Sequence, residues 1–243
     1  MIDIHCHILP GIDDGAKNLT EAKRMLKLQL DSGVNCMYLT PHFDPEEKTL
    51  ERFLTEREEA WSWLSSDYSC LNGLQMRLGA EVSCCGALLS LDLSKLTLGT
   101  TNYLLLEFPQ RYPAYAESVI QLLLDKGVIP ILAHVERYSY FREEPGLLMR
   151  LINLGVLAQV SAQALFDKRD RNFAVACLRH NLAQIVASDA HNISTRKPCM
   201  DLLYKLPEEL LKLHNSFSAA VWENKSPEKI QATRISKTFF GYC

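Results

Sequence analysis

The sequence has 243 residues, of which 47% are hydrophobic, and a formal net charge of −3. This length predicts one domain, residues 1–243, with a substantial core, and the charge provides no basic field for nucleic acid, so no nucleic-acid partner is expected. The chain opens without a basic segment followed by an apolar one, and no apolar run approaches the roughly 20 residues that cross a bilayer. We expect a cytoplasmic protein that is not embedded in a membrane; an oligomer is compatible with the sequence.

The eight cysteines do not follow the pattern of a secreted disulfide scaffold. Several lie inside apolar strand or helix patterns, where free cysteine behaves as a small hydrophobic side chain. The sequence has no Cys-x-x-Cys pair for a structural zinc ion. We expect the adjacent Cys84 and Cys85 to contribute to packing.

The first predicted strand is residues 1–7, which read MIDIHCH. The alternation of a strand places His5 and His7 on one face, where two imidazoles supply half of a metal site. The alternative is a pair of polar residues on an exposed edge strand. The loop 9–15 is rich in Gly, Pro and Asp, and its simplest interpretation is a turn whose aspartates cap the backbone.

Helices and strands then alternate along the chain. We expect a helix from Thr20, as N-cap, to residue 32, and another over 46–64. A strand at 36–40 is followed by His42. The strand 75–82 carries Glu81 near its end, and a buried carboxylate there needs an arginine or a metal as a partner.

The later strands also end in polar residues. Further helices are expected at 114–126, 147–153, 171–180 and 207–213, and a short one from 226. The strands expected at 103–108, 128–133 and 184–188 deliver Glu107, His134 and the pair Asp189 and His191, whereas the strand 156–161 carries no residue of a metal-binding type. Arg137 and Arg196 follow two of these ends. The tail 239–243 has no assigned role.

Alternation of strands and helices predicts a mostly parallel sheet, and closure into a barrel brings the strand ends to one rim. Nine imidazole and carboxylate side chains then converge at the C-terminal rim. They are His5, His7, Asp14, His42, Glu81, Glu107, His134, Asp189 and His191. Nitrogen and oxygen ligands without thiolate suit Zn²⁺, Fe or Mn²⁺. Nine exceed the needs of one ion, so we expect two or three divalent ions bridged by a carboxylate such as Glu81.

Such clusters promote in-line displacement at phosphorus, so the predicted reaction is hydrolysis of a phosphoester by metal-activated water. The guanidinium groups of Arg137 and Arg196 match phosphate oxygens, and surface salt bridges are the alternative for both. Cysteine-based tyrosine phosphatases are excluded, because no cysteine is separated from an arginine by five residues. The sequence also has no Gly-x-Ser-x-Gly nucleophile elbow.

Seven motifs, from residue 1 to about residue 196, resemble those of the bacterial CpsB/YwqE-type protein-tyrosine phosphatases. This family belongs to the polymerase and histidinol phosphatase (PHP) superfamily. The motifs are MIDIHCH at 1–7, DDG at 13–15, TPH at 40–42, GAE at 79–81, LEF at 106–108, AHVER at 133–137 and ASDAHN at 187–192.

The resemblance implies a distorted, TIM-like (β/α)₇ barrel with a trinuclear, usually manganese-loaded site at the C-terminal rim of the strands. The implied ligand sets are His5, His7, Glu81 and Asp189 for one ion, Glu81, Glu107 and His134 for the second, and Asp14, His42 and His191 for the third. The implied phosphate-binding residues are Arg137 and Arg196, and with Glu107 and His134 they are the predicted catalytic residues.

The implied substrate is the tyrosine-rich C-terminal cluster of a bacterial tyrosine autokinase that controls capsule or exopolysaccharide synthesis. The expected enzyme is therefore a phosphoric monoester hydrolase acting on phosphotyrosine. Two alternatives stay open. One is a PHP phosphoesterase for a small molecule, such as histidinol phosphate, which predicts a deeper and lidded pocket. The other is a barrel that only binds a kinase tail or metal.

Overall fold

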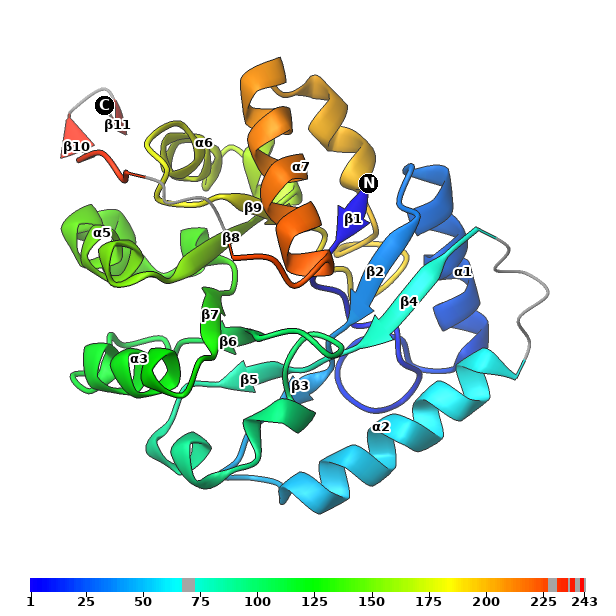
Figure 1. Ribbon diagram of the computed structural model, residues 1–243. Coiled ribbons are helices and arrows are strands. Elements are labelled where there is room, and N and C mark those ends of the chain that lie inside the picture. The colour runs from blue at the N-terminus through cyan, green and yellow to red at the C-terminus, as the bar shows by residue number, and fades with distance from the viewer. Residues whose placement is uncertain (67–72, 227–230, 236, 239–240, 243) are drawn as a thin grey trace.

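Parallel strands curve around the centre of the molecule, and helices lie outside them (Figure 1). The computed structural model describes residues 1–66, 73–226, 231–235, 237–238 and 241–242. The strands are β1 (Ile2–Asp3), β2 (Cys36–Leu39), β3 (His42–Phe43), β4 (Gln75–Leu78), β5 (Glu81–Ser83), β6 (Tyr103–Glu107), β7 (Ile129–Leu132), β8 (Leu157–Ser161), β9 (Ile185–Ala187), β10 (Lys237–Thr238) and β11 (Gly241–Tyr242).

The α-helices alternate with these strands. They are α1 (Leu19–Asp31), α2 (Leu50–Ser65), α3 (Ala116–Asp125), α4 (Ser139–Glu143), α5 (Pro145–Leu154), α6 (Arg171–Arg179) and α7 (Glu208–Trp222). Short 3₁₀ helices are η2 (Gly86–Ser90), η3 (Leu93–Lys95), η4 (Val135–Arg137), η5 (Gln163–Leu165) and η6 (Met200–Lys205). No helix among the described residues has the length and apolar character needed to cross a membrane.

Two parallel sheets make up the curved wall, with strand orders β1-β2-β4 and β3-β5-β6-β7-β8-β9. The chain passes directly from β2 to β3 and from β4 to β5, so the two sheets are continuous along the chain. At the other seam, Cys6 and Ala190 form a parallel bridge, and the His7 N–H donates to the Ala190 carbonyl at 2.8 Å. The predicted distorted α/β barrel is confirmed.

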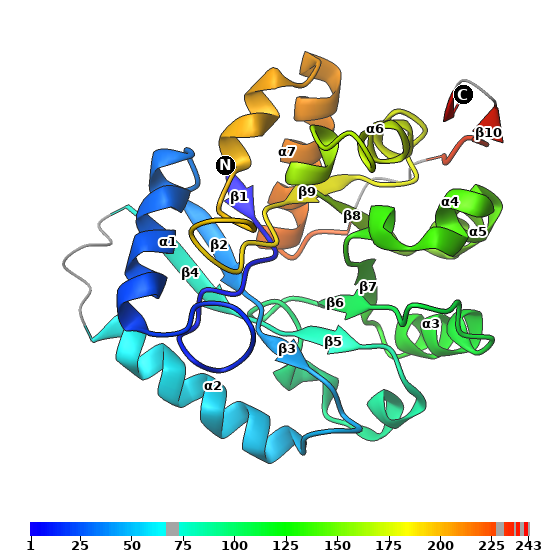
Figure 2. The same cartoon turned by 180° about the vertical axis from the view of Figure 1, so that it is seen from behind.

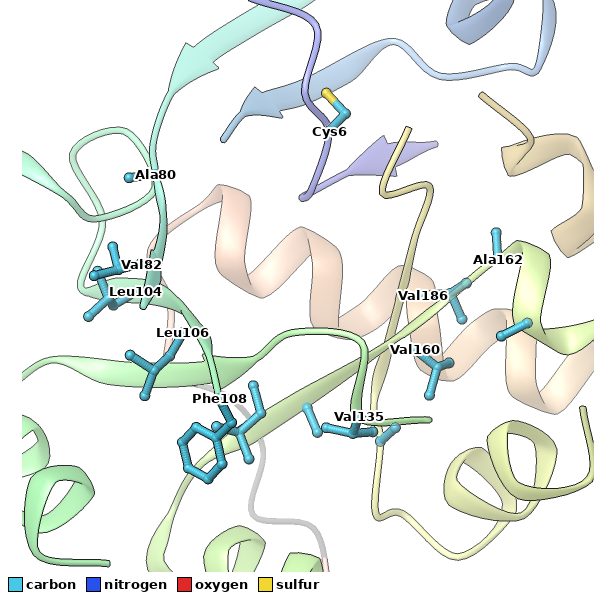
Figure 3. Close-up of a cluster of buried hydrophobic side chains, with 14 of the residues drawn as sticks. Cys6, Ala80, Val82, Leu104, Leu106, Phe108, Val135, Val160, Ala162 and Val186 are labelled. Atoms are coloured by element: carbon cyan, nitrogen blue, oxygen red, sulfur yellow. The ribbon is translucent and has the colours of Figure 1, made fainter. Parts of the chain in front are cut away.

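Alternating side chains on the strands build two cores. Leu104 and Leu106 of β6 point outward, into a large core shared with the surrounding helices (Figure 3). Tyr103 and Leu105 point inward, into a smaller core inside the curved wall. A strand that is buried on both faces reads as a continuous apolar run, which explains the sequence of β6. Glu107 is the next inward position after Leu105, so it enters the interior at the rim.

Helix α7 packs across β9 and β1, as both views of the ribbon show (Figures 1 and 2). Its Phe217 and Val221 fill the inner core. The Arg77 guanidinium lies 3.8 Å from the centroid of the Trp222 ring, a cation–π contact that holds the end of the helix on β4. Helix α7 therefore leaves the C-terminal ends of the strands uncovered, and polar side chains lie at those ends.

Several predicted boundaries are wrong. Asn18, rather than Thr20, is the N-cap of α1, and its side chain accepts a hydrogen bond from the Glu21 N–H at 3.0 Å. The predicted strand 75–82 is two strands, since the chain breaks at Gly79, where a Cβ would lie 2.9 Å from Leu98. Helix α7 is longer than the predicted 207–213. The short helix predicted from 226 falls largely outside the described residues.

Candidate metal centre

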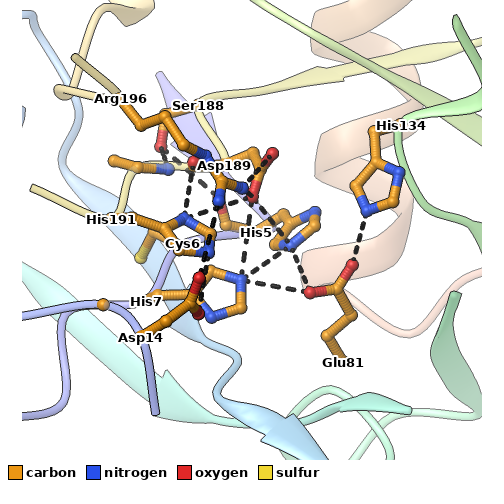
Figure 4. A network of polar contacts seen from close by, with 12 residues as sticks. His5, Cys6, His7, Asp14, Glu81, His134, Ser188, Asp189, His191 and Arg196 are labelled. Carbon is orange, nitrogen blue, oxygen red and sulfur yellow. Dashed lines mark hydrogen bonds and ion pairs between the residues drawn. The ribbon is translucent and has the colours of Figure 1, made fainter. Parts of the chain in front are cut away.

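All nine predicted ligands meet at the C-terminal rim, each within 4 Å of another member of the set. Figure 4 shows all of them but His42 and Glu107 by label. They come from the chain after β1, from β3, β5 and β6, and from the segments that follow β7 and β9. The strand ends thus bring together residues that lie up to 186 positions apart in the sequence. Whether these side chains bind metal stays a prediction.

Glu81 lies at the centre of this group and is buried, with 1% of the residue exposed. Its Oε2 atom lies 3.1 Å from nitrogens of three imidazoles, those of His5, His7 and His42. Its Oε1 atom lies 2.8 Å from His134 Nε2. A carboxylate with both oxygens facing imidazoles in this way is placed to bridge cations.

Three sets of ligand atoms lie within 4.8 Å of one another: His5, His7 and Glu81; His42, Glu81 and Glu107; and His7, Asp14, His42 and His191. These sets resemble the three implied by the family motifs. The first lacks Asp189, whose Oδ1 is 3.4 Å from His5 Nε2. The second has His42 in place of His134, and the third gains His7.

The donor atoms fit a cation. His191 Nε2 is buried and has no hydrogen-bond partner among the described residues, and Glu81 Oε2 accepts no well-aligned hydrogen bond although it faces three imidazoles. An unsatisfied buried polar atom costs about 1–3 kcal/mol. Cations between these atoms would remove that cost, and the nitrogen and oxygen donors suit Mn²⁺, Fe or Zn²⁺.

Burial and neighbouring charges together set the protonation of the groups at the centre. Burial favours the neutral form of Glu81, but the surrounding imidazoles hold the pKa of this carboxyl well below its usual value. Burial, with the nearby Glu81 charge, raises the pKa of Glu107. Burial, with the nearby imidazole of His7, lowers the pKa of His191 to about 3. Glu81 therefore carries a negative charge and His191 is neutral, which are the forms in which these side chains bind a cation.

Two contacts that support the ligands were not predicted as parts of the site. Asp13 Oδ2 accepts a hydrogen bond from His7 Nδ1 at 2.7 Å, which leaves Nε2 of that ring facing the centre. Gln159 Oε1 lies 3.2 Å from His5 Nδ1 and accepts the His134 N–H at 2.7 Å. Asp13 belongs to the predicted turn and does cap the Gly15 N–H. Gln159 lies on the strand predicted to carry no residue of a metal-binding type, and an amide is consistent with that prediction.

A buried network fixes the ends of β1 and β9 to each other. Asp3 accepts hydrogen bonds from the Ser188 N–H at 3.0 Å and from Gln29 Nε2 at 2.6 Å, and all three residues are buried. Since Asp3 precedes His5 and Ser188 precedes Asp189, the network sets the spacing between two groups of candidate ligands.

His134 and Asp189 have left-handed backbones, with φ angles of 33° and 49°. This conformation costs a residue other than glycine about 1–2 kcal/mol. Both residues lie two positions after a strand end, that of β7 and that of β9, and the turn aims their side chains into the centre (Figure 4). Strain of this kind is typical of functional sites.

Arg137 and Arg196 both reach the rim, where each forms an ion pair with Asp189. The Arg196 Nη2 atom is 2.8 Å from Asp189 Oδ1, and Arg196 also lies 3.8 Å from Asp14. About a third of each arginine side chain is exposed, 36% and 33%. Both arginines thus form salt bridges, with a buried carboxylate rather than at the open surface, and their role in phosphate binding stays a prediction.

Asp13→Asn is expected to weaken metal binding about 10- to 100-fold, because the amide no longer provides the anionic partner that orients His7. The fold should persist, since Asn keeps the shape of the side chain. Calorimetric titration of the metal-free protein with metal measures the change in affinity. Asp31→Asn, at the exposed end of α1, is the matched control and should bind metal as the parent does. Equal affinities for both variants would contradict the role given to Asp13.

A rim of imidazoles and carboxylates on a curved parallel α/β sheet is typical of metal-binding barrel proteins. The family model "Capsular polysaccharide synthesis, CpsB/CapC" matches residues 1–211, and the chain belongs to this family. The predicted family resemblance is thus confirmed.

Named relatives are similar over most of their length. Tyrosine-protein phosphatase YwqE of Bacillus subtilis (strain 168) is 34% identical over 222 residues, which are 86% of this chain and 85% of that protein. Tyrosine-protein phosphatase CpsB of Streptococcus pneumoniae is 31% identical over 228 residues, 85% of this chain and 89% of that protein.

A crystal structure from the set on YwqE of B. subtilis and CpsB of S. pneumoniae, described as metal-dependent tyrosine phosphatases, has the same fold. It matches with a TM-score of 0.85 at 32% sequence identity and covers 96% of this chain and all of that one. Metal dependence and tyrosine phosphatase activity are thus stated for the relatives.

Proposed function

We propose that the protein is a metal-dependent protein-tyrosine phosphatase. The observation that carries the proposal is the rim itself, in which Glu81 faces four imidazoles and two arginines lie at the edge. The relatives that share 31% and 34% identity are tyrosine-protein phosphatases by name, which supports the same activity here.

Nine residues would hold two or three divalent ions, with manganese as the proposed metal: His5, His7, Asp14, His42, Glu81, Glu107, His134, Asp189 and His191. When bound, such ions supply an activated water and Lewis-acid stabilisation of phosphate oxygens. Arg137 and Arg196 bind the phosphate dianion, and because they already converge on Asp189, they are held at the rim before the substrate arrives. Glu107 and His134 complete the centre next to Glu81.

An exposed edge of the centre favours a protein substrate over a small one. The side chains of Asp14 and His42 are 64% and 36% exposed, so the rim is accessible from outside. A phosphotyrosine side chain that projects from a polypeptide can reach such a rim although no pocket encloses it. A small substrate such as histidinol phosphate would need a pocket that surrounds it.

The proposed substrate is the phosphotyrosine-bearing tail of a bacterial tyrosine autokinase that controls capsule or exopolysaccharide synthesis. The name of the matched family, capsular polysaccharide synthesis, supports this context. We also propose a cytoplasmic location. The described cysteines are free thiols, at Cys6, Cys36, Cys84, Cys85, Cys177 and Cys199, which fits a reducing compartment.

The test is phosphate release from a phosphotyrosyl peptide and from histidinol phosphate, after chelation and with Mn²⁺, Zn²⁺ or Mg²⁺ restored. We expect activity to disappear on chelation, to return with Mn²⁺, and to favour the peptide. A preference for histidinol phosphate would overturn the substrate while keeping the metal chemistry. Metal binding without turnover of either substrate would show a barrel that only binds.

A further inference from the structure

A cleft of about 310 Å³ opens directly beside the metal centre. Its walls come from the chain segments at the ends of β3, β5 and β6, which are neighbours in the sheet (Figure 1). Glu107 lines this cleft and also belongs to the set His42, Glu81 and Glu107. A substrate whose phosphate lies at the centre therefore has the cleft immediately next to it.

The charge of the cleft is negative. The free carboxylates that line it are those of Asp44 and Glu46, since Glu107, also in its wall, is assigned to the centre; no lysine, arginine or histidine is among its lining residues in the described part of the chain. The Glu46 N–H donates to Asp44 Oδ1 at 2.8 Å, which fixes the two acidic residues relative to each other. Neither Asp44 nor Glu46 forms an ion pair within the described ranges. The carboxylates would repel a phosphate dianion, so the cleft is not a second phosphate site.

The remaining walls suit a long aliphatic side chain with a cationic end. The Tyr115 hydroxyl donates to the Cys84 carbonyl at 3.1 Å, which holds a ring that is 44% exposed at the edge of the cleft. The face of an aromatic ring attracts a cation. Cys84 and Cys85, 4% and 6% exposed, line the cleft with soft, weakly polar thiols that suit methylene groups.

We propose that this cleft binds a lysine or arginine side chain of the substrate, two positions from the phosphotyrosine. This proposal rests on the proposed function. In an extended peptide, residues i and i±2 point the same way and lie about 6–7 Å apart, whereas residues i±1 point away. A peptide that presents its phosphate to the arginines and the metal centre therefore presents its second neighbour to the acidic cleft.

The test compares phosphotyrosyl peptides that differ only at the second neighbour, with lysine, alanine or glutamate there, together with para-nitrophenyl phosphate, which has no neighbour. We expect kcat/KM to be about fivefold higher for lysine than for glutamate, and the ratio to fall as salt is added. In Glu46→Gln and Asp44→Asn the ratio should shrink toward one, while para-nitrophenyl phosphate is hydrolysed as before. Glu47→Gln, next in sequence but outside the cleft, should keep the full ratio.

Two failures are distinguishable. Equal rates for all three peptides in an enzyme that does hydrolyse phosphotyrosine would overturn the cleft proposal alone. Absence of hydrolysis of every phosphotyrosyl peptide, with metal present, would overturn the proposed function. A lysine preference that Glu46→Gln and Asp44→Asn both leave intact would also count against the cleft, because the preference would then arise elsewhere on the surface.

Discussion

Replacement of Glu81 by glutamine is expected to lower phosphate release from a phosphotyrosyl peptide at least about a thousandfold. Glutamine keeps the size of the side chain but removes the charge that faces His5, His7 and His42 at 3.1 Å. The bridging ligand of the proposed cluster is then lost. Initial rates with Mn²⁺ and the metal content per chain measure the effect, and both should fall.

Glu136→Gln is the matched control for this prediction. Glu136 is also 1% exposed and lies two residues after His134, but it forms no ion pair with the rim histidines among the described residues. Its Oε1 accepts the Ser161 N–H at 3.2 Å, which the amide oxygen of glutamine can also accept, and burial raises the pKa of this carboxyl. The rate should stay within about threefold of the parent. Equal losses in both variants would show that packing, and not the Glu81 charge, explains the first result.

The sequence was sufficient to predict which side chains converge at the rim, because strand ends in a parallel α/β fold meet at one rim. His5 and His7 could be placed on one face by the period of a strand, and Asp189 and His191 repeat the same spacing. Glu81 and Glu107 were visible as charges near the ends of apolar strands. Each pattern is local in the chain, and only the convergence of the strands had to be assumed.

The supporting contacts could not be predicted in the same way. The role of Gln159, on β8, depends on His134, which follows the neighbouring strand β7, and on His5, which follows β1 in the other sheet. A neutral amide carries no signal of metal chemistry. Asp3 meets Ser188 only because the seam closes at Cys6 and Ala190. Such contacts arise from tertiary structure, so a single sequence does not specify them.

The length of α7 was underestimated for a related reason. The part of α7 beyond the predicted end at residue 213 contains His214 and Ser218, polar residues that interrupt an apolar helical pattern, yet both are buried. The Ser218 hydroxyl donates to the His214 carbonyl at 2.7 Å, and His214 Nδ1 accepts the Val186 N–H. Partners on β9 and within the helix satisfy these groups, and those partners are evident only in the folded chain.

Removal of divalent metal from the protein is expected to lower its melting temperature by roughly 10 °C. Metal at about a thousand times its dissociation constant stabilises a fold by about 4 kcal/mol, and 1 kcal/mol shifts the transition of a chain this long by about 2–4 °C. The physical reason is that Glu81 and Asp189 are buried anions, each 1% exposed, and that His191 Nε2 beside them makes no hydrogen bond to the described residues.

Thermal unfolding of the chelated protein, titrated with Mn²⁺, Zn²⁺ or Mg²⁺, measures this shift. Mn²⁺ and Zn²⁺ should raise the melting temperature more than Mg²⁺ does. Four imidazoles face Glu81, whereas Mg²⁺ prefers oxygen ligands and retains its water. Glu81→Gln should show a much smaller shift with the same ions. Identical melting temperatures with and without metal would mean that the imidazoles neutralise the buried carboxylates by themselves, and the rim would then be a stable polar network rather than a metal centre.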